Sequence, residues 1–158
     1  YNSPCGDIIM GWIDDELCLC DWVNRKNRET IDRRMRRTMK ADMQQGTSSV
    51  IELAIQQLDE YFSGERKSFD IPLRFAGTDF QQLVWKELCR IPYGQTASYG
   101  EVAARIGMPT SVRAVANANG ANAIAIFVPC HRVIGSNKTL TGYAGGLEAK
   151  QFLLDLER

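Results

Sequence analysis

The first apolar residues of the chain follow the pattern of β-strands. One strand-like run covers residues 8–13 and a second covers residues 17–22, and the polar cluster Asp14-Asp15-Glu16 separates them. Two such runs on either side of a short turn predict a β-hairpin. A third short run lies at residues 69–73, where Pro72 suits a sheet edge because proline has no N–H to donate. The pattern therefore predicts a three-stranded antiparallel sheet.

Between the hairpin and this third strand the apolar positions take up a helical period. Apolar residues from Ile51 to Phe62 recur every three or four positions, which predicts an amphipathic helix. Ser48 or Ser49 is the expected N-cap, and Gly64 is expected to end the helix. Residues 25–45 are too polar to contribute a core, so we expect a surface helix or a mobile excursion there. The first part of the chain is thus predicted to be a small α/β unit.

After residue 76 the predicted elements are helices. Two capping boxes, in which Ser or Thr is followed by Glu or Gln three positions later, begin at Thr78 and Ser98. The first helix is expected to run to about Arg90 and the second to stop at Gly107. Residues 77–158 are therefore predicted to form a mostly α unit.

Two further helices are expected at residues 111–119 and 147–157. Two short helices joined by a turn that contains Gly107 are typical of a helix-turn-helix, although ordinary helical bundles contain similar corners. The small residues at 112–119 would let that helix approach a DNA duplex closely, and they would equally let it pack against other helices. Arg113 is its one long cation, either a solvated side chain or a probe that reaches into DNA.

Composition narrows the class of protein. With 158 residues, 44% of them hydrophobic and 24% charged, the chain is an ordinary globular protein, and no apolar run approaches the roughly 20 residues that span a bilayer. The formal net charge is zero, but residues 102–147 contain no carboxylate. The cations in that stretch are Arg105, Arg113, Arg132 and Lys138. Such a surface meets phosphates without like-charge repulsion, so nucleic acid is a candidate partner.

A second basic run covers residues 25–40. It contains eight cations and two carboxylates, Glu29 and Asp32. A solvated helix or loop fits this pattern, and so does a surface that contacts phosphates. The sequence leaves these two interpretations open.

The five cysteines are scattered along the chain. An odd number of them without a secretory signal pattern predicts free thiols and a reducing, cytoplasmic environment. Cys5, Cys18 and Cys20 are the grouping that suggests zinc, but no histidine lies nearby and no Cys-x-x-Cys pair occurs. We therefore expect no metal.

The strongest chemical signal is the hexapeptide Pro129-Cys130-His131-Arg132-Val133-Ile134, which contains the one histidine of the chain. A free thiol has a pKa of roughly 8.5, and a neighbouring cation lowers it. The pair therefore indicates a partly buried cysteine held as a nucleophilic thiolate. A buried cysteine beside an unrelated histidine is the alternative. Because the two residues are adjacent, direct contact between their side chains is awkward, and a bridging water is favoured.

Around this hexapeptide the sequence resembles the O6-alkylguanine-DNA alkyltransferases (methylated-DNA–protein-cysteine methyltransferases). The resemblance covers most of residues 77–157 and is looser over residues 1–76. The matching residues are Phe80-Gln81-x-x-Val84-Trp85, Ile91-Pro92-Tyr93-Gly94, Ser98-Tyr99, Arg113-Ala114-Val115, Asn122, Pro129-Cys130-His131-Arg132-Val133, Gly142-Tyr143-Ala144-Gly145-Gly146 and Glu157.

The resemblance implies a fold and a reaction. The fold would be a ribonuclease H-like α/β unit over residues 1–76, with a three-stranded antiparallel sheet and a helix, followed by a helical alkyltransferase domain over residues 77–158 with a helix-turn-helix. Cys130 would take the alkyl group from O6-alkylguanine in DNA, irreversibly and once. His131 would remove the thiol proton through a water, Glu157 would orient His131, and Asn122 would hold the backbone near Cys130.

The resemblance also implies how DNA is held. The target base must leave the stack, so Arg113 would fill the gap, and Tyr99 would press on a phosphate and supply a proton to the departing guanine. The other residues implied at the substrate or DNA are Ser98, Ala114, Val133, Tyr143 and Ala144. The small face of residues 112–119 favours minor-groove binding with little sequence preference. The partner would be double-stranded DNA with alkylated bases, and we expect a monomer without cofactor, metal or membrane contact.

Three other classes of protein were weighed. A cysteine hydrolase usually takes its histidine from a distant part of the sequence. A module that binds lesions without repairing them would not need Cys130. A purely structural protein would leave the carboxylate-free stretch without explanation. The range of alkyl groups, activity on O4-alkylthymine and the role of residues 1–76 are not predicted.

Overall fold

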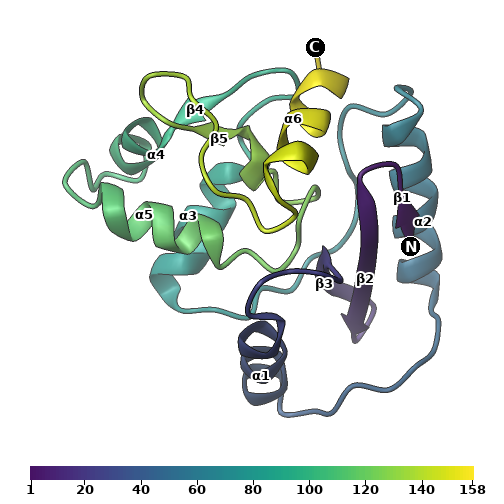
Figure 1. Cartoon of the computed structure of the whole chain (residues 1–158). Coiled ribbons are helices and arrows are strands. Elements are labelled where there is room, and N and C mark those ends of the chain that lie inside the picture. The colour runs from purple at the N-terminus through teal and green to yellow at the C-terminus, as the bar shows by residue number, and fades with distance from the viewer.

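The structure, a computed structural model, describes all 158 residues. The N-terminal part is an antiparallel sheet with two helices, and the rest is mostly helical (Figure 1). Its first elements are β1 (Asn2–Ser3), β2 (Gly6–Ile13), β3 (Glu16–Trp22), α1 (Arg28–Met39) and α2 (Ser49–Phe62). The predicted combination of a three-stranded antiparallel sheet, a helix and a helical C-terminal part is confirmed.

The predicted hairpin is β2 and β3, which pair from Ile8 opposite Trp22 to Ile13 opposite Glu16. Asp14 and Asp15 both have positive φ, 48° and 63°, as a two-residue type I′ turn requires. Glu16, expected in the turn, is the first residue of β3.

The third strand is not the one that the sequence indicated. The sheet order is β1-β2-β3, so the N-terminal residues pair with β2. Residues 69–73 instead contribute one parallel bridge, Leu73 with Leu17, through bonds from Leu17 N to Pro72 O and from Arg74 N to Leu17 O. The carbonyl of Pro72 accepts the bond from Leu17 N, so the bridge does not require the N–H that proline lacks.

The basic run does form a surface helix, α1, but the expectation that it contributes no core was wrong. Ile31 and Met35 of α1 are buried against Cys18 and Leu19 of the hairpin in a small second core. Two apolar residues four positions apart lie on the same face of a helix, and here they are enough to pack an otherwise polar helix against the hairpin.

The C-terminal part contains α3 (Asp79–Leu88), β4 (Ala97–Ser98), α4 (Tyr99–Arg105), α5 (Val112–Gly120), a 3₁₀ turn (Cys130–Arg132), β5 (Val133–Ile134) and α6 (Leu147–Leu156). Both capping boxes are confirmed, because the Thr78 and Ser98 hydroxyls accept from the backbone three residues on. β4 and β5 are parallel, with Ala97 opposite Val133. That short ladder, which the sequence did not predict, joins the start of α4 to the strand after Cys130.

One core of 27 buried residues draws on both parts of the chain. The backbone also joins them, because Cys20 N donates to Ala123 O at 2.8 Å and Ala125 N donates to Cys20 O at 2.6 Å. The hairpin therefore supports the segment that leads to Cys130. None of the helices is both long enough and apolar enough to cross a bilayer.

Candidate active site

Cys130 lies at the start of the 3₁₀ turn, and 5% of its surface is exposed. Two tight turns precede it. In the first, Phe127 N donates to Ala125 O at 2.8 Å around Ile126, whose φ is 73°. In the second, Cys130 N donates to Val128 O at 2.8 Å around Pro129, whose φ is −80° and ψ is 62°. These are γ-turns, and a positive φ at a β-branched residue is strained. The surrounding structure therefore holds the backbone in a strained conformation in the residues just before Cys130.

The side chain of Asn122 helps to hold this backbone segment in place. Its amide Nδ2 donates to Val128 O at 3.0 Å, and its Oδ1 accepts from Ile124 N at 2.9 Å. The side chain is buried and ties both ends of the segment that contains the first γ-turn. The side chain of Asn122 thus contacts the backbone near Cys130, and its role in the reaction stays a prediction.

His131 is fully buried, and its Nε2 lies 2.7 Å from Oε2 of Glu157. Burial lowers the pKa of His131, although Glu157 acts in the opposite direction, so the imidazole is neutral at pH 7. A neutral ring bonded to a carboxylate at Nε2 must carry its proton there. The lone pair is then on Nδ1, which has no hydrogen-bond partner in the protein. The arrangement thus leaves an unpartnered basic nitrogen on the residue that follows Cys130 in the sequence.

Glu157 is also held by Arg132, which the sequence suggested as a phosphate-facing cation, and by Tyr61, which the sequence did not single out. Arg132 donates to both carboxylate oxygens, Nε to Oε1 at 2.8 Å and Nη2 to Oε2 at 3.0 Å, and the Tyr61 hydroxyl donates to Oε2 at 2.6 Å. Burial alone would raise the pKa of Glu157, but the hydrogen bonds from His131 and Arg132 lower it to about 2. The carboxylate is therefore ionised at all physiological pH values.

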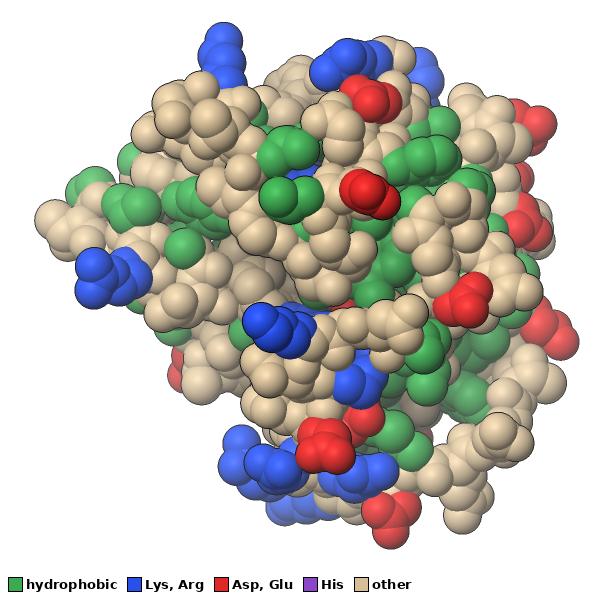
Figure 2. All heavy atoms as spheres, in the orientation of Figure 1, with side chains coloured by type: hydrophobic (Ala, Val, Ile, Leu, Met, Phe, Trp, Pro, Cys, Tyr) green, Lys and Arg blue, Asp and Glu red, His purple; other side chains and the backbone are tan.

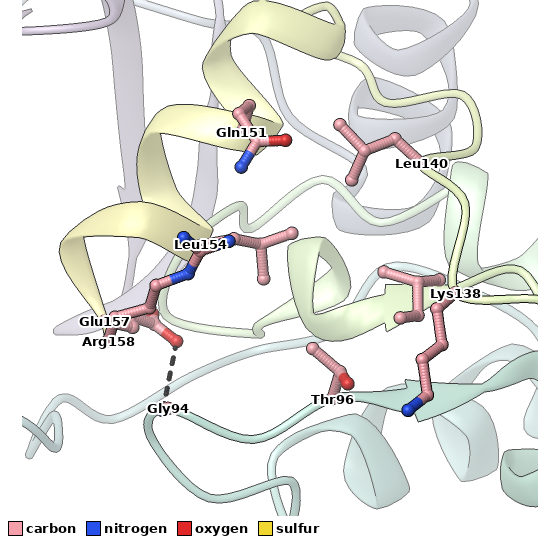
Figure 3. Close-up of a pocket in the computed structure, with 9 residues that line it drawn as sticks. Gly94, Thr96, Lys138, Leu140, Gln151, Leu154, Glu157 and Arg158 are labelled. Atoms are coloured by element: carbon pink, nitrogen blue, oxygen red, sulfur yellow. Dashed lines mark hydrogen bonds between the residues drawn. The ribbon is translucent and has the colours of Figure 1, made fainter.

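Glu157 closes one side of a cavity of about 230 Å³ between the end of α6 and the turn at Gly94 (Figure 3). Gly94 N donates to Glu157 Oε1 at 3.4 Å, drawn as a dashed line in Figure 3. The lining includes Lys138 and Leu140 but neither Cys130 nor His131. This cavity lies behind the carboxylate and is not the place where a base would meet the thiol.

The expectation of a thiolate at rest was wrong. Burial raises the pKa of the Cys130 thiol, while Asn122, Lys150 and Arg25 only reduce that rise. The expected helper, a protonated histidine, is absent because His131 is neutral. Cys130 is therefore a neutral thiol, which could act as a nucleophile only after a base removes its proton.

Lys150 is fully buried, which the sequence did not indicate. Its Nζ donates to Val133 O at 2.7 Å, to Thr141 O at 3.3 Å and to Thr141 Oγ1 at 3.2 Å. The Tyr99 hydroxyl lies 2.6 Å from the same Thr141 Oγ1. Val133, which the resemblance implied at the substrate, thus has its carbonyl already bonded to Lys150.

Tyr143 contacts the N-terminal part of the chain. Its ring packs edge-on against Trp22 with centroids 6.0 Å apart, and its buried hydroxyl has no protein partner. Gly145 approaches the same indole so closely that a Cβ would lie 2.4 Å from it. Ala144 is partly buried beside them. Trp22 is therefore a neighbour of this loop that sequence reasoning missed, since nothing in a strand residue signals such a contact.

On α5, Arg113 and Ala114 are exposed, whereas Val115 and Ala118 are buried. The small residues of this helix therefore serve packing on one face and leave the other open. Ser98 caps α4 and its hydroxyl is engaged with Glu101 N. Of the residues that the resemblance assigned to DNA, Arg113 and Ala114 are the ones on this open face.

The distribution of charge differs from the expectation in one respect. Arg132 is buried with Glu157 and is not part of a phosphate-facing surface. Lys and Arg side chains gather over α1 at the foot of the view in Figure 2. The exposed cations of that run are Lys26, Arg33, Arg36, Arg37 and Lys40.

Other members of the basic run turn inward. Arg25 donates to the Asp21 carboxylate at 2.8 Å, to Asn122 O at 3.0 Å and to Gly120 O. Arg34 donates to Ala121 O at 2.7 Å and lies over the Trp85 ring. These guanidinium groups occupy the carbonyls at and just after the C-terminal end of α5, where cations are favoured. Residues of the first part of the chain thereby hold α5.

The cysteines that suggested zinc do not assemble a site. Cys20 is in the main core and Cys5 packs against that core, whereas Cys18 is in the small second core. No group of three His, Cys, Asp or Glu side chains is arranged to hold a metal. All five cysteines are free.

Two family models cover nearly the whole chain. Residues 1–75 match the ribonuclease-like domain of 6-O-methylguanine DNA methyltransferase, and residues 79–158 match its DNA-binding domain. The chain belongs to the 6-O-methylguanine DNA methyltransferase family.

Individual proteins that are similar to this chain carry names from the same family. The constitutive methylated-DNA–protein-cysteine methyltransferase of Bacillus subtilis is 46% identical over 99% of this chain and 92% of its own. The methylated-DNA–protein-cysteine methyltransferase of Methanosarcina barkeri is 48% identical over 99% and 93%. A crystal structure of Mycobacterium tuberculosis OGT in complex with DNA matches with a TM-score of 0.84 at 43% identity, covering 99% of this chain and 89% of that one.

Proposed function

We propose that this chain repairs DNA by transferring the alkyl group of O6-alkylguanine to the Sγ of its own Cys130. The observation that carries the proposal is the buried arrangement of Cys130 beside a neutral His131 that Glu157 holds by its Nε2. Membership of the family and the methyltransferase relatives support the same reaction.

The chemistry begins with the thiol. The Nδ1 lone pair of His131 accepts the Cys130 proton, through a bridging water because adjacent side chains are poorly placed for direct contact. Glu157, ionised and already hydrogen-bonded to the ring, stabilises the imidazolium that forms. The thiolate exists only while this transfer proceeds, which keeps a buried nucleophile unreactive towards other electrophiles.

The thiolate then attacks the alkyl carbon. The S–C bond forms as the C–O6 bond breaks, and the electron pair of that bond stays on guanine. Tyr99 donates its hydroxyl proton to the guanine, which leaves as the neutral base, and the proton on His131 restores the phenol through solvent. A thioether is a poor leaving group, so Cys130 is not regenerated and each chain reacts once.

The target base must leave the duplex to reach a thiol of which 5% is exposed. We assign Arg113 and Ala114, on the open face of α5, to the gap that the base leaves. Tyr143 and the backbone of Ala144 would line the pocket for the base, and the unpartnered Tyr143 hydroxyl supports this role. Minor-groove contact through a helix face of small residues, with Arg113 as its one charged side chain, suits a protein that must act at any sequence.

The remaining assignments follow from this function. We propose residues 1–76 as a supporting unit and residues 77–158 as the unit that binds DNA and reacts, which the two family matches support. All the groups named above lie in one chain, which supports action as a monomer. The reaction needs a reduced Cys130, which supports a cytoplasmic location.

Intact mass spectrometry and peptide mapping after mixing with a duplex that bears one O6-methylguanine test the proposal. We expect a stoichiometric mass increase of one CH₂ group on the Cys130 peptide, absent in Cys130→Ser. An unmodified protein with an intact lesion would overturn it. Multiple turnovers of an ester or thioester would instead indicate a hydrolase, and tight binding of the lesion without transfer would indicate a recognition module.

A further inference from the structure

Tyr99, Thr141 and Lys150 form a continuous chain of hydrogen-bonding side chains. Tyr99 Oη lies 2.6 Å from Thr141 Oγ1, and Lys150 Nζ donates to the same Oγ1 at 3.2 Å. Thr141 is therefore the one side chain that joins the phenol of the proposed proton donor to a buried cation.

The donors and acceptors allow an arrangement in which Thr141 donates its hydroxyl proton to Tyr99. A lysine ammonium has three N–H donors and no acceptor. Around Lys150 there are three acceptors, namely Val133 O, Thr141 O and Thr141 Oγ1. Oγ1 therefore accepts from Lys150, and its single O–H is free to donate to Tyr99 Oη.

This arrangement has a consequence for Tyr99. When Thr141 donates to Oη, the phenolic O–H is not used within the protein and can be donated to a substrate. Loss of that proton leaves a phenolate, and a hydrogen bond to an ionised acceptor is stronger than one to a neutral acceptor. The bond from Thr141 thus strengthens as the proton leaves, which is the differential stabilisation that lowers a barrier.

We propose that Thr141 is a positioning residue that orients the Tyr99 hydroxyl for proton donation to the departing guanine and stabilises the phenolate that results. This inference rests on the proposed function, in which Tyr99 is the proton donor. Lys150 acts one step further back, because its N–H occupies one of the two acceptor positions of Thr141 Oγ1 and so favours donation by the Thr141 hydroxyl.

Single-turnover transfer from a duplex with one O6-methylguanine provides the test. Thr141→Val keeps the shape of the side chain and removes the hydroxyl, and we expect the rate constant for transfer to fall about tenfold, roughly the net effect of one hydrogen bond. Thr141→Ser should restore most of the rate. Thr139→Val is the matched control, because Thr139 lies in the same loop but is exposed and bonds to Asn137.

Two further measurements separate positioning from a general loss of structure. Duplex affinity, measured in a Cys130→Ser background, should be unchanged by Thr141→Val. In a Tyr99→Phe background, Thr141→Val should have no additional effect on the rate, because the hydroxyl it orients is gone.

The outcomes are distinguishable. If wild-type protein shows no transfer to Cys130, the proposed function fails. If wild-type protein reacts and Thr141→Val reacts as fast, or if the two substitutions act additively, the role of Thr141 is overturned.

Discussion

The carboxylate of Glu157 lies 2.7 Å from Nε2 of His131, although 26 positions separate the two residues in the sequence. This contact decides which ring nitrogen carries the proton. Because Nε2 donates to the carboxylate, the basic lone pair is on Nδ1, which has no partner in the protein. A residue at the C-terminal end of α6 thereby sets the tautomer of a histidine in a turn elsewhere in the chain.

Replacing Glu157 with Gln should slow transfer strongly. A glutamine amide can donate to Nε2 and so favour the tautomer with the proton on Nδ1, and it cannot stabilise an imidazolium. General acid–base catalysis contributes about 10²–10⁴-fold, and we expect a loss in this range in the single-turnover rate constant. Asp155→Asn, an exposed acid near the same helix end, is the control. A Glu157→Gln rate within about threefold of wild type would contradict the assignment.

The same carboxylate should make stability depend on pH. The pKa of Glu157 is lowered from 4.5 to about 2 in the folded protein, so its contribution is fully present above pH 4.5 and disappears as the pH falls towards 2. This lowering of the pKa of Glu157 corresponds to roughly 3 kcal/mol at neutral pH. His131 adds to the loss, beginning below its ordinary pKa of 6.5, because it is buried in the neutral form.

Urea unfolding followed from about pH 7 down to about pH 2.5 measures this dependence. Wild type should lose unfolding free energy steeply below pH 4.5. Glu157→Gln should be less stable at neutral pH, because Arg132 loses its partner, and should have a shallower slope between pH 4.5 and 2. Equal slopes in the two proteins would refute the assignment of the low pKa to Glu157.

Local sequence patterns were enough to predict most of the fold. The hairpin, the α2 helix and both capping boxes depend on residues a few positions apart, and each is present. β1 was missed because a strand of two residues is too short to show an alternation of apolar and polar positions. The third strand was misplaced because residues 69–73 have the composition of a strand, whereas the choice of partner for β2 is made by the fold as a whole.

The partners within the candidate site could not be derived in the same way. Arg132 and Lys150 have the sequence signature of solvated cations, and their burial follows only from where Glu157, Val133 and Thr141 end up in space. The thiolate expectation failed for a related reason. Proximity in sequence suggested a charged histidine, but burial keeps His131 neutral and raises the pKa of Cys130.

Arg25 should contribute to stability through its bonds to the end of α5. The side chain of Arg25 is 8% exposed, and Arg25→Met removes its three hydrogen bonds. Arg28, at 3.2 Å, then remains as the one ion-pair partner of Asp21. We expect a loss of about 2–4 kcal/mol in unfolding free energy, measured with urea. Arg33→Met, an exposed arginine of α1, should stay within about 0.5 kcal/mol. If the two variants are equally stable, the inward arginines do not hold α5.

Arg113 should matter only when the target base is stacked in a duplex. Its side chain is exposed and makes no hydrogen bond or ion pair within the protein, so Arg113→Ala should leave folding unchanged. If it fills the space of the flipped base, the variant should transfer the methyl group from a duplex roughly tenfold or more slowly, since flipping and unstacking a base cost a few kcal/mol. Transfer from the free nucleoside O6-methylguanosine, which has no stack, should proceed at the wild-type rate. If Arg113→Ala slows transfer from duplex and nucleoside equally, Arg113 acts on the reaction in the pocket instead. If it slows neither, Arg113 has no role at the site.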